Sequence, residues 1–135
     1  MGRHSLVEHT GEVQVRLEAA TLAGLFAEAA LALAEIMGGP FADPGREGGT
    51  PVRLEARDRN ALLVDWLNEL VYLAERDKRL YGAAEIDHVS DRELSARVFG
   101  RELPYLRLHV KAATFHGLDI REGPGGLTAQ VVLDI

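Results

Sequence analysis

Acidic side chains occur at two places in the sequence where they could bind a metal ion. Glu8 and Glu12 flank His9 just before the first predicted strand, and Asp134 directly precedes Ile135, the last residue. Hard cations such as calcium and magnesium take clustered oxygen ligands. If the last segment is an ordered strand, its final carboxylate lies beside Asp134, and an acidic side chain from a neighbouring strand would complete a cation site. Taken singly, each segment is more typical of solvated polar residues.

Two further groups of polar residues could serve a partner or a reaction. Lys111 and His116 lie five residues apart in extended sequence, which places them on opposite strand faces if no bulge intervenes. A lone lysine there usually marks the solvent face, and a lone histidine is usually structural. Asp65 and Glu69 lie one helical turn apart, where like charges repel by about a few tenths of a kcal/mol. This pair is typical of a solvated helix face, although an acidic stripe could also dock on a basic partner.

The composition excludes several kinds of chemistry. The chain has no cysteine, which excludes disulfides, thiolate metal sites and thiol nucleophiles. No serine lies in a nucleophile elbow, and the glycines of residues 38–49 lack the spacing of a phosphate-binding loop. The formal net charge of −6 opposes the counterion release by which basic proteins grip nucleic acids. Strong direct nucleic-acid binding is therefore not expected, whereas an RNA-handling protein partner is compatible with the sequence.

The length and apolar content predict one globular domain. A chain of 135 residues with 47% apolar residues can bury a single core. No stretch approaches the roughly 18 uninterrupted apolar residues of a membrane span, and the polar residues 1–10 do not read as a leader segment. Since the absence of cysteine fits a reducing compartment, we expect a cytoplasmic protein without a membrane anchor.

Hydrophobic periodicity predicts a strand followed by a helix in the first third of the chain. Apolar and polar residues alternate over residues 13–17, as in a strand with one buried face, after a polar, histidine-containing opening segment. Thr21 is expected to cap a helix that ends at residues 38–40, because apolar residues recur between them at helical spacing. A surface loop rich in glycine and charged residues is predicted from there to Pro51.

The same pattern then starts again. Residues 52–56 repeat the letters of residues 15–19, Val-Arg-Leu-Glu-Ala, at an offset of 52 − 15 = 37, and the helical stripes that follow also align. We interpret residues 13–37 and 52–78 as an internal strand-helix duplication whose two units share one core.

The second half of the chain predicts one strong helix and a series of strands. The helix spans about residues 60–78, is expected to be capped by Asn60, and buries a stripe that includes Trp66. The class is α+β, with two main helices packed on one extended antiparallel sheet. The last two predicted strands form a hairpin across a Gly-Pro-Gly turn. The predicted strands are residues 84–89, 93–99, 106–114, 115–121 and 127–135.

Four segments, in order from about residue 8 to the last residue, together resemble the archease family. The resemblance implies a duplicated strand-helix-strand-strand fold and a protein that is not itself an enzyme. It implies a cofactor for the GTP-dependent RNA ligase that joins ends carrying a 3′-phosphate or cyclic phosphate, promoting ligase guanylylation and multiple turnover in tRNA splicing or RNA repair. The segments are His9-Thr10-Gly11-Glu12, Asp65-Trp66-Leu67-Asn68-Glu69-Leu70, Val110-Lys111-Ala112-Ala113-Thr114-Phe115-His116 and Gln130-Val131-Val132-Leu133-Asp134-Ile135.

The resemblance also implies a divalent cation, calcium in the first place, with magnesium or manganese as alternatives. Its ligands carry over to Glu12, Asp134 and Ile135. The chain departs from the family at Gly11-Glu12, where the family has Ala-Asp. Glutamate keeps the charge but reaches one methylene further, which could shift the site or weaken it.

The expected partners follow from the same resemblance. Lys111 matches the family's Val-Lys-Ala strand, and together with His9 and His116 it is a candidate for the surface that faces the RNA-splicing ligase. Our hypothesis is that an acidic, cation-bearing edge is presented to the ligase's metal and nucleotide pocket. The alternative function is that of a chaperone-like modulator of a tRNA methyltransferase. A small-molecule sensor or metal hydrolase on a similar fold would need a deep apolar pocket.

Overall fold

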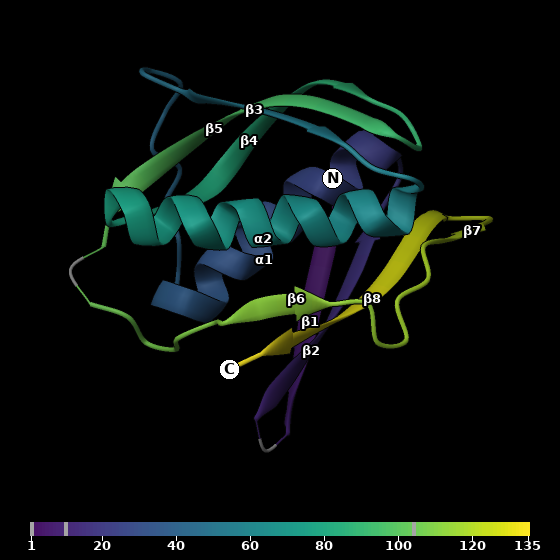
Figure 1. Ribbon diagram of the computed structural model, residues 1–135, viewed down its shortest axis with the longest axis horizontal. Coiled ribbons are helices and arrows are strands. Elements are labelled where there is room, and N and C mark those ends of the chain that lie inside the picture. Colours follow the sequence, from purple (N-terminus) through teal and green to yellow (C-terminus); the bar gives the residue numbers. More distant parts are fainter. Residues whose placement is uncertain (1, 10, 104) are drawn as a thin grey trace.

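The computed structural model describes residues 2–9, 11–103 and 105–135, with the backbone alone for residues 8 and 9. Within these residues, two helices and eight strands form an α+β fold, which confirms the predicted class (Figure 1). The elements are β1 Arg3–His9, β2 Glu12–Ala19, α1 Leu22–Gly38, β3 Thr50–Glu55, α2 Arg59–Asp77, β4 Arg79–Val89, β5 Glu93–Glu102, β6 Ala112–Thr114, β7 Arg121–Gly123 and β8 Gly126–Asp134.

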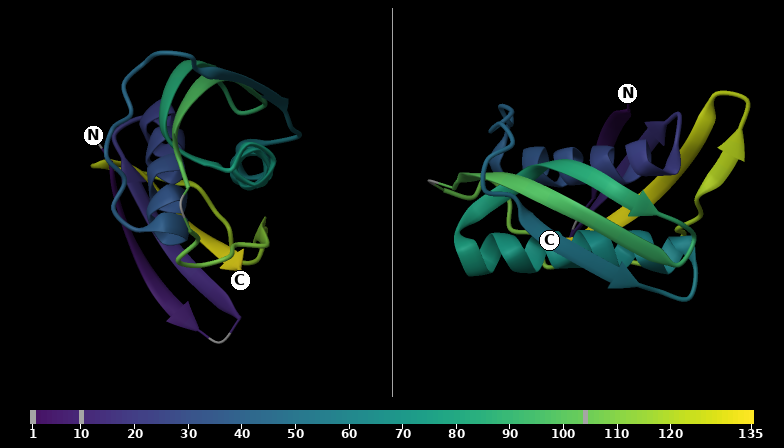
Figure 2. Two further views of the ribbon diagram at one scale, coloured as in Figure 1. Left: turned by 90° about the vertical axis from the view of Figure 1, so that its left-hand side faces the viewer. Right: turned by 90° about the horizontal axis from the view of Figure 1, so that it is seen from above.

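The strands form two antiparallel sheets, where we expected one. The larger sheet has the order β1-β2-β8-β6, with β7 also paired to β8, and the smaller sheet has the order β3-β5-β4. Both helices lie between the two sheets (Figure 2). The reason lies in α1, whose only charged residues are Glu28 and Glu35. A helix that is apolar on almost every side is stable only when it is covered on almost every side, and α1 packs on β2 and on β4.

The first predicted strand and helix are confirmed. In β2 the core-facing residues alternate with more exposed ones. α1 begins as expected after Thr21, whose hydroxyl accepts a hydrogen bond from the Gly24 N–H at 3.0 Å. The opening segment differs from the prediction. Residues 3–9 form β1, which pairs with β2 along the whole length of β1. Its polar residues gave no alternation from which a strand could be predicted.

The cap predicted for α2 was wrong by two residues. Asp58 is the capping residue, and its carboxylate accepts from the Ala61 N–H at 2.8 Å. The Asn60 side chain instead accepts a hydrogen bond from the Ile120 N–H at 3.0 Å, so it ties α2 to the segment before β7. Both residue types are good caps, and the tertiary contact decides between them.

The predicted strands over 106–114 and 115–121 are much shorter in the structure. The Arg107 and Leu108 N–H groups both donate to the Met37 carbonyl, at 2.7 and 3.3 Å, so this stretch caps the end of α1 and does not join a sheet. The chain then turns at His116 and forms no further strand until β7. The expected final hairpin is confirmed, since β7 and β8 pair across Pro124 and Gly125.

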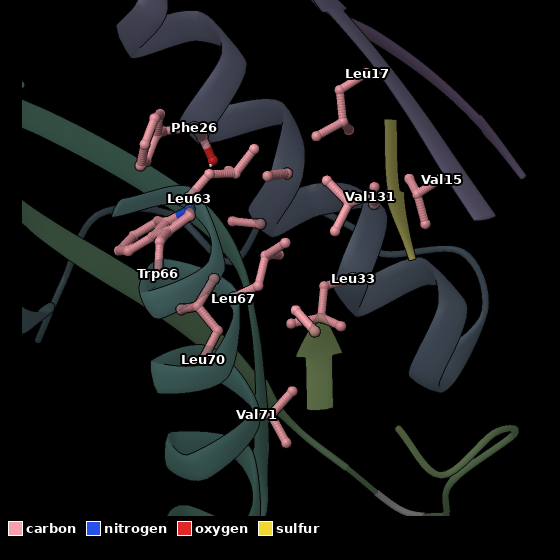
Figure 3. Close-up of a cluster of buried hydrophobic side chains, with 14 of the residues drawn as sticks. Val15, Leu17, Phe26, Leu33, Leu63, Trp66, Leu67, Leu70, Val71 and Val131 are labelled. Atoms are coloured by element: carbon pink, nitrogen blue, oxygen red, sulfur yellow. Dashed lines mark hydrogen bonds between the residues drawn. The ribbon is translucent and has the colours of Figure 1, made fainter. Parts of the chain in front are cut away.

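The core lies between the sheets and centres on Trp66 (Figure 3). The Trp66 ring is fully buried, lies 6.3 Å from the Phe26 ring, and donates its indole N–H to the Phe26 carbonyl at 2.9 Å. This bond satisfies the polar atom of the largest core residue and joins α2 to α1. Both predicted units contain a strand followed by a helix, β2 with α1 and β3 with α2, and their origin by duplication stays a prediction.

Within the described part of the chain, neither helix combines the length and apolar character that crossing a bilayer requires.

Candidate functional site

The two acidic segments predicted from the sequence meet at one end of the larger sheet. β2 begins at Glu12 and β8 ends at Asp134, and these two residues lie directly opposite each other in the antiparallel ladder. Both side chains lie on the outer face, because the next pair along the strands, Val13 and Leu133, is buried in the core. We refer to Glu12, Asp134, Ile135 and Lys111 as the acidic edge.

Backbone hydrogen bonds make this a close pair. The Ile135 N–H donates to the Gly11 carbonyl at 3.1 Å, so the Glu12–Asp134 pair is flanked by a hydrogen-bonded position. A pair of this non-hydrogen-bonded type has its side chains closer together than its neighbours do. Gly11 has a φ of +78°, in the left-handed region that favours glycine, and this accounts for the glycine at the turn before Glu12. Ile135 is half-buried and packs on the core, which holds the main chain at residue 135 in place.

The main chain of Lys111, just before β6, lies beside Asp134. Its N–H donates to the Asp134 carbonyl at 2.8 Å, and the next residue, Ala112, pairs with Asp134. Lys111 itself is exposed. The acidic edge therefore brings together residues from the two ends of the chain and from its last third.

Asn68 on α2 positions β6, and reasoning from the sequence missed this function. Its side-chain oxygen accepts from the Ala113 N–H at 2.7 Å, and its amide donates to the Ala113 carbonyl at 3.4 Å. Two hydrogen bonds from one side chain substitute for a neighbouring strand along the free edge of β6. The sequence feature that could have indicated this function was an amide residue beside the apolar stripe of a helix.

The other two predicted partner-facing residues differ in position, since the main chain of His9 pairs with Glu12 in the β1–β2 ladder whereas His116 lies apart from the acidic edge. His116 lies in the exposed turn after β6, where its N–H donates to the Thr114 hydroxyl at 3.3 Å. The side chain of His9 and all of Thr10 lie outside the described residues.

The acidic edge suits a hard cation by the kind of its donors. Two like charges directly opposite each other on a sheet are destabilising, and a bound cation would reverse that effect. The described residues form no ion pair with Glu12 or Asp134, and they include no group of three or more acidic or histidine side chains that could hold a metal. Two side-chain carboxylates supply fewer oxygens than calcium takes, so main-chain oxygens or water would complete its shell.

An apolar cavity between α1 and the larger sheet is too small for a substrate. Its volume is about 10 Å³, roughly the space of one water molecule. Its lining includes Val15, Leu33, Leu67 and Val131. This cavity does not supply the deep apolar pocket that a small-molecule sensor or hydrolase would need.

The chain matches the model of the Archease protein family (MTH1598/TM1083) over residues 4–135. Protein archease of Methanosarcina acetivorans is 29% identical, with 98% of this chain and 96% of that protein covered. The solution structure of protein 1598 of Methanobacterium thermoautotrophicum superposes with a TM-score of 0.72 at 28% identity, covering 98% of both chains.

A second solved structure has the same fold at lower identity. It is the crystal structure of an archease from Thermotoga maritima, described as a possible chaperone. It superposes with a TM-score of 0.62 at 18% identity, covering 96% of this chain and 94% of that one.

Proposed function

This chain belongs to the archease family, and on that premise we propose that it is a non-enzymatic protein cofactor that activates a GTP-dependent RNA ligase. In this proposal it promotes guanylylation of the ligase, which uses the GTP, and allows multiple turnover on RNA ends with a 3′-phosphate. The observation that carries the proposal is the position of Glu12 opposite Asp134, next to the main chain of Lys111, on the outer face at one end of the larger sheet.

We propose that Glu12, Asp134 and the carboxylate of Ile135 hold a divalent cation, calcium or a similar hard ion. When bound, the ion would supply positive charge that offsets the repulsion of the two opposed carboxylates. Glu12 and Asp134 would supply side-chain oxygens, and the hydrogen bond from Ile135 to Gly11 would keep residue 135 beside them.

The acidic edge would meet the ligase at its basic, RNA-handling surface. A protein with a net charge of −6 has the right sign for that surface, and complementary charge favours fast and specific association. Lys111 lies beside the carboxylates and would pair with an acidic or phosphate group of the partner. Lys111 directly precedes β6, so Asn68 would act as a positioning residue through its two bonds to Ala113.

A ligation time course with RNA in excess over ligase tests the proposal. Without this chain, product should stop at about one RNA joined per ligase, and with it the reaction should continue over many turnovers. The Glu12→Gln and Asp134→Asn double variant should lose most of this stimulation. The same two changes at exposed loop positions, Glu47→Gln and Asp91→Asn, should leave the stimulation intact.

Two results would contradict parts of the proposal. Unchanged turnover in the presence of the chain would overturn the ligase function, and full activity of the double variant would overturn the part played by the acidic edge. Suppression of tRNA methyltransferase aggregation without any effect on ligation would favour the chaperone-like alternative, which the description of the Thermotoga relative also suggests.

A further inference from the structure

A second cluster of titratable groups lies where β1 meets α1, away from the acidic edge. The His4 ring of β1 is placed between two carboxylates, with Nδ1 at 2.5 Å from Glu28 and Nε2 at 2.5 Å from Glu35. Exposed fractions of 17%, 10% and 34% for the side chains of His4, Glu28 and Glu35 show that all three are largely shielded from water. The two glutamates are the only charged residues of α1.

The number of protons on His4 decides whether both contacts are favourable. A neutral imidazole has one N–H and one lone pair, whereas the charged ring has two N–H groups. A carboxylate faces each nitrogen here, so only the charged ring donates to both. Once the ring is neutral, the lone pair of one ring nitrogen faces a carboxylate oxygen. That carboxylate, on a mostly buried helix, then lacks the N–H donor that the charged ring supplied.

The other charged groups near His4 already have partners of their own. Across the β1–β2 ladder His4 faces Leu17, which is apolar and buried. On either side of Leu17, Arg16 and Glu18 pair with each other at 3.3 Å, and Glu18 also pairs with Arg3. Because they pair among themselves, these groups do not supply the hydrogen bonds that a charged His4 ring donates to Glu28 and Glu35.

We propose that His4 is a proton-dependent latch that holds the edge strand β1 on α1. β1 has β2 as its sheet partner, and β2 is also paired with β8 along its full length. Loss of the proton from His4 therefore loosens β1 while β2, β8 and the core stay folded. Histidine is the side chain whose charge ordinarily changes between pH 5 and 8, and this is the range in which the latch is tested.

Hydrogen exchange on the intact chain tests the latch. Protection factors are measured between pH 5.5 and 8.0, with the intrinsic pH dependence of exchange divided out. We expect the protection of the β1 amides beyond His4 to fall by about tenfold as pH rises, the factor that corresponds to one weakened charged hydrogen bond. Protection of the β8 amides facing β2 should stay constant.

A matched pair of variants separates the latch from a general effect of pH. In Glu35→Gln the side-chain amide can donate to the lone pair of a neutral ring, so the protection of β1 should become nearly independent of pH. Glu69→Gln makes the same change on α2 and should keep the wild-type dependence. Equal pH dependence in wild type and Glu35→Gln, or no dependence in wild type, would overturn the latch.

A measurement on the wild-type chain complements the variants. The ¹⁵N shifts of the His4 ring report whether one or both nitrogens carry a proton. We expect both nitrogens to be protonated wherever β1 is fully protected, and a neutral ring in a fully protected strand would overturn the proposal.

Discussion

Two pairs of carboxylates are arranged differently in this protein. Glu28 and Glu35 point at one histidine, which lies between them and supplies an N–H to each when it is charged. Glu12 and Asp134 face each other across a sheet, and no cationic side chain among the described residues forms an ion pair with either. The first pair is shielded between β1 and α1, and the second lies on an outer face.

The difference teaches what each pair is suited to. A shielded carboxylate requires a partner, and the fold supplies one from β1. A pair on an outer face, with Glu12 half-buried and Asp134 exposed, is tolerated by solvation, so it can remain available for a ligand that comes from outside. On this reasoning the His4 cluster stabilises the protein, whereas the acidic edge is open to the cation or the protein partner that we propose.

Removal of His4 should give the largest loss of stability. His4→Ala leaves the two shielded carboxylates of Glu28 and Glu35 without a donor, and we expect a loss of about 2–3 kcal/mol in the free energy of unfolding. Urea denaturation measures it. His88→Ala, at an exposed histidine of β4, should change stability by less than about 0.5 kcal/mol. Equal effects of the two substitutions would remove the distinction between the pairs.

Calcium should stabilise the protein through the acidic edge. At a free concentration ten times the Kd, a single site that exists only in the folded state adds about 1.4 kcal/mol. Thermal unfolding with and without calcium measures this gain, and Glu12→Gln should abolish it. His4→Ala should retain it, because His4 contacts the other carboxylate pair. A gain that persists in Glu12→Gln would place the cation elsewhere.

Neutralising one member of the exposed pair should have a smaller effect, of opposite sign. In the absence of divalent cations, Asp134→Asn removes the repulsion across the sheet and should raise stability by about 0.5 kcal/mol. In saturating calcium the same substitution should be destabilising. A loss of stability under both conditions would show that Asp134 has a favourable partner of another kind.

The smallest expected effect concerns Asp77, a half-buried carboxylate with a cationic residue, Arg76, next to it in the chain. The Arg76 guanidinium, and after it the Tyr81 hydroxyl, lower the pKa of Asp77 to about 2. Because this folded-state pKa lies below the ordinary value of 3.8, the contribution to stability is present above pH 4 and is lost as pH falls toward 2. The free energy of unfolding, measured at pH 5 and at pH 2.5, should decrease less between these two pH values for Asp77→Asn than for the wild type.

Much of the fold could be predicted because it is encoded locally. The alternation over residues 13–17 and the apolar stripes of the two helices fall where β2, α1 and α2 lie. β1 escaped prediction because its stability comes from β2 and α1 and not from its own pattern. Residues 106–111 were predicted as strand, but in the structure the Arg107 and Leu108 N–H groups cap α1. The division into two sheets depends on which faces of α1 must be buried.

The candidate site was predictable in its residues and not in its geometry. Glu12 and Asp134 were singled out separately, and the family resemblance suggested that they form one site. Their direct opposition follows from the register between β2 and β8, which the buried pair Val13 and Leu133 sets through packing. The positions of Asn68 and of β6 depend on the same packing.

The sequence by itself determined the helices, the main strands, the net charge of −6 and the acidic residues available for chemistry, because these depend on residue type and on spacing along the chain. Only the tertiary structure decided which carboxylates face each other and which of them has a proton donor. His4 and Glu28 are 24 residues apart, and Glu12 and Asp134 lie near opposite ends of the chain. Such contacts arise when apolar faces pack together and fix strand register, and local spacing carries no record of that register.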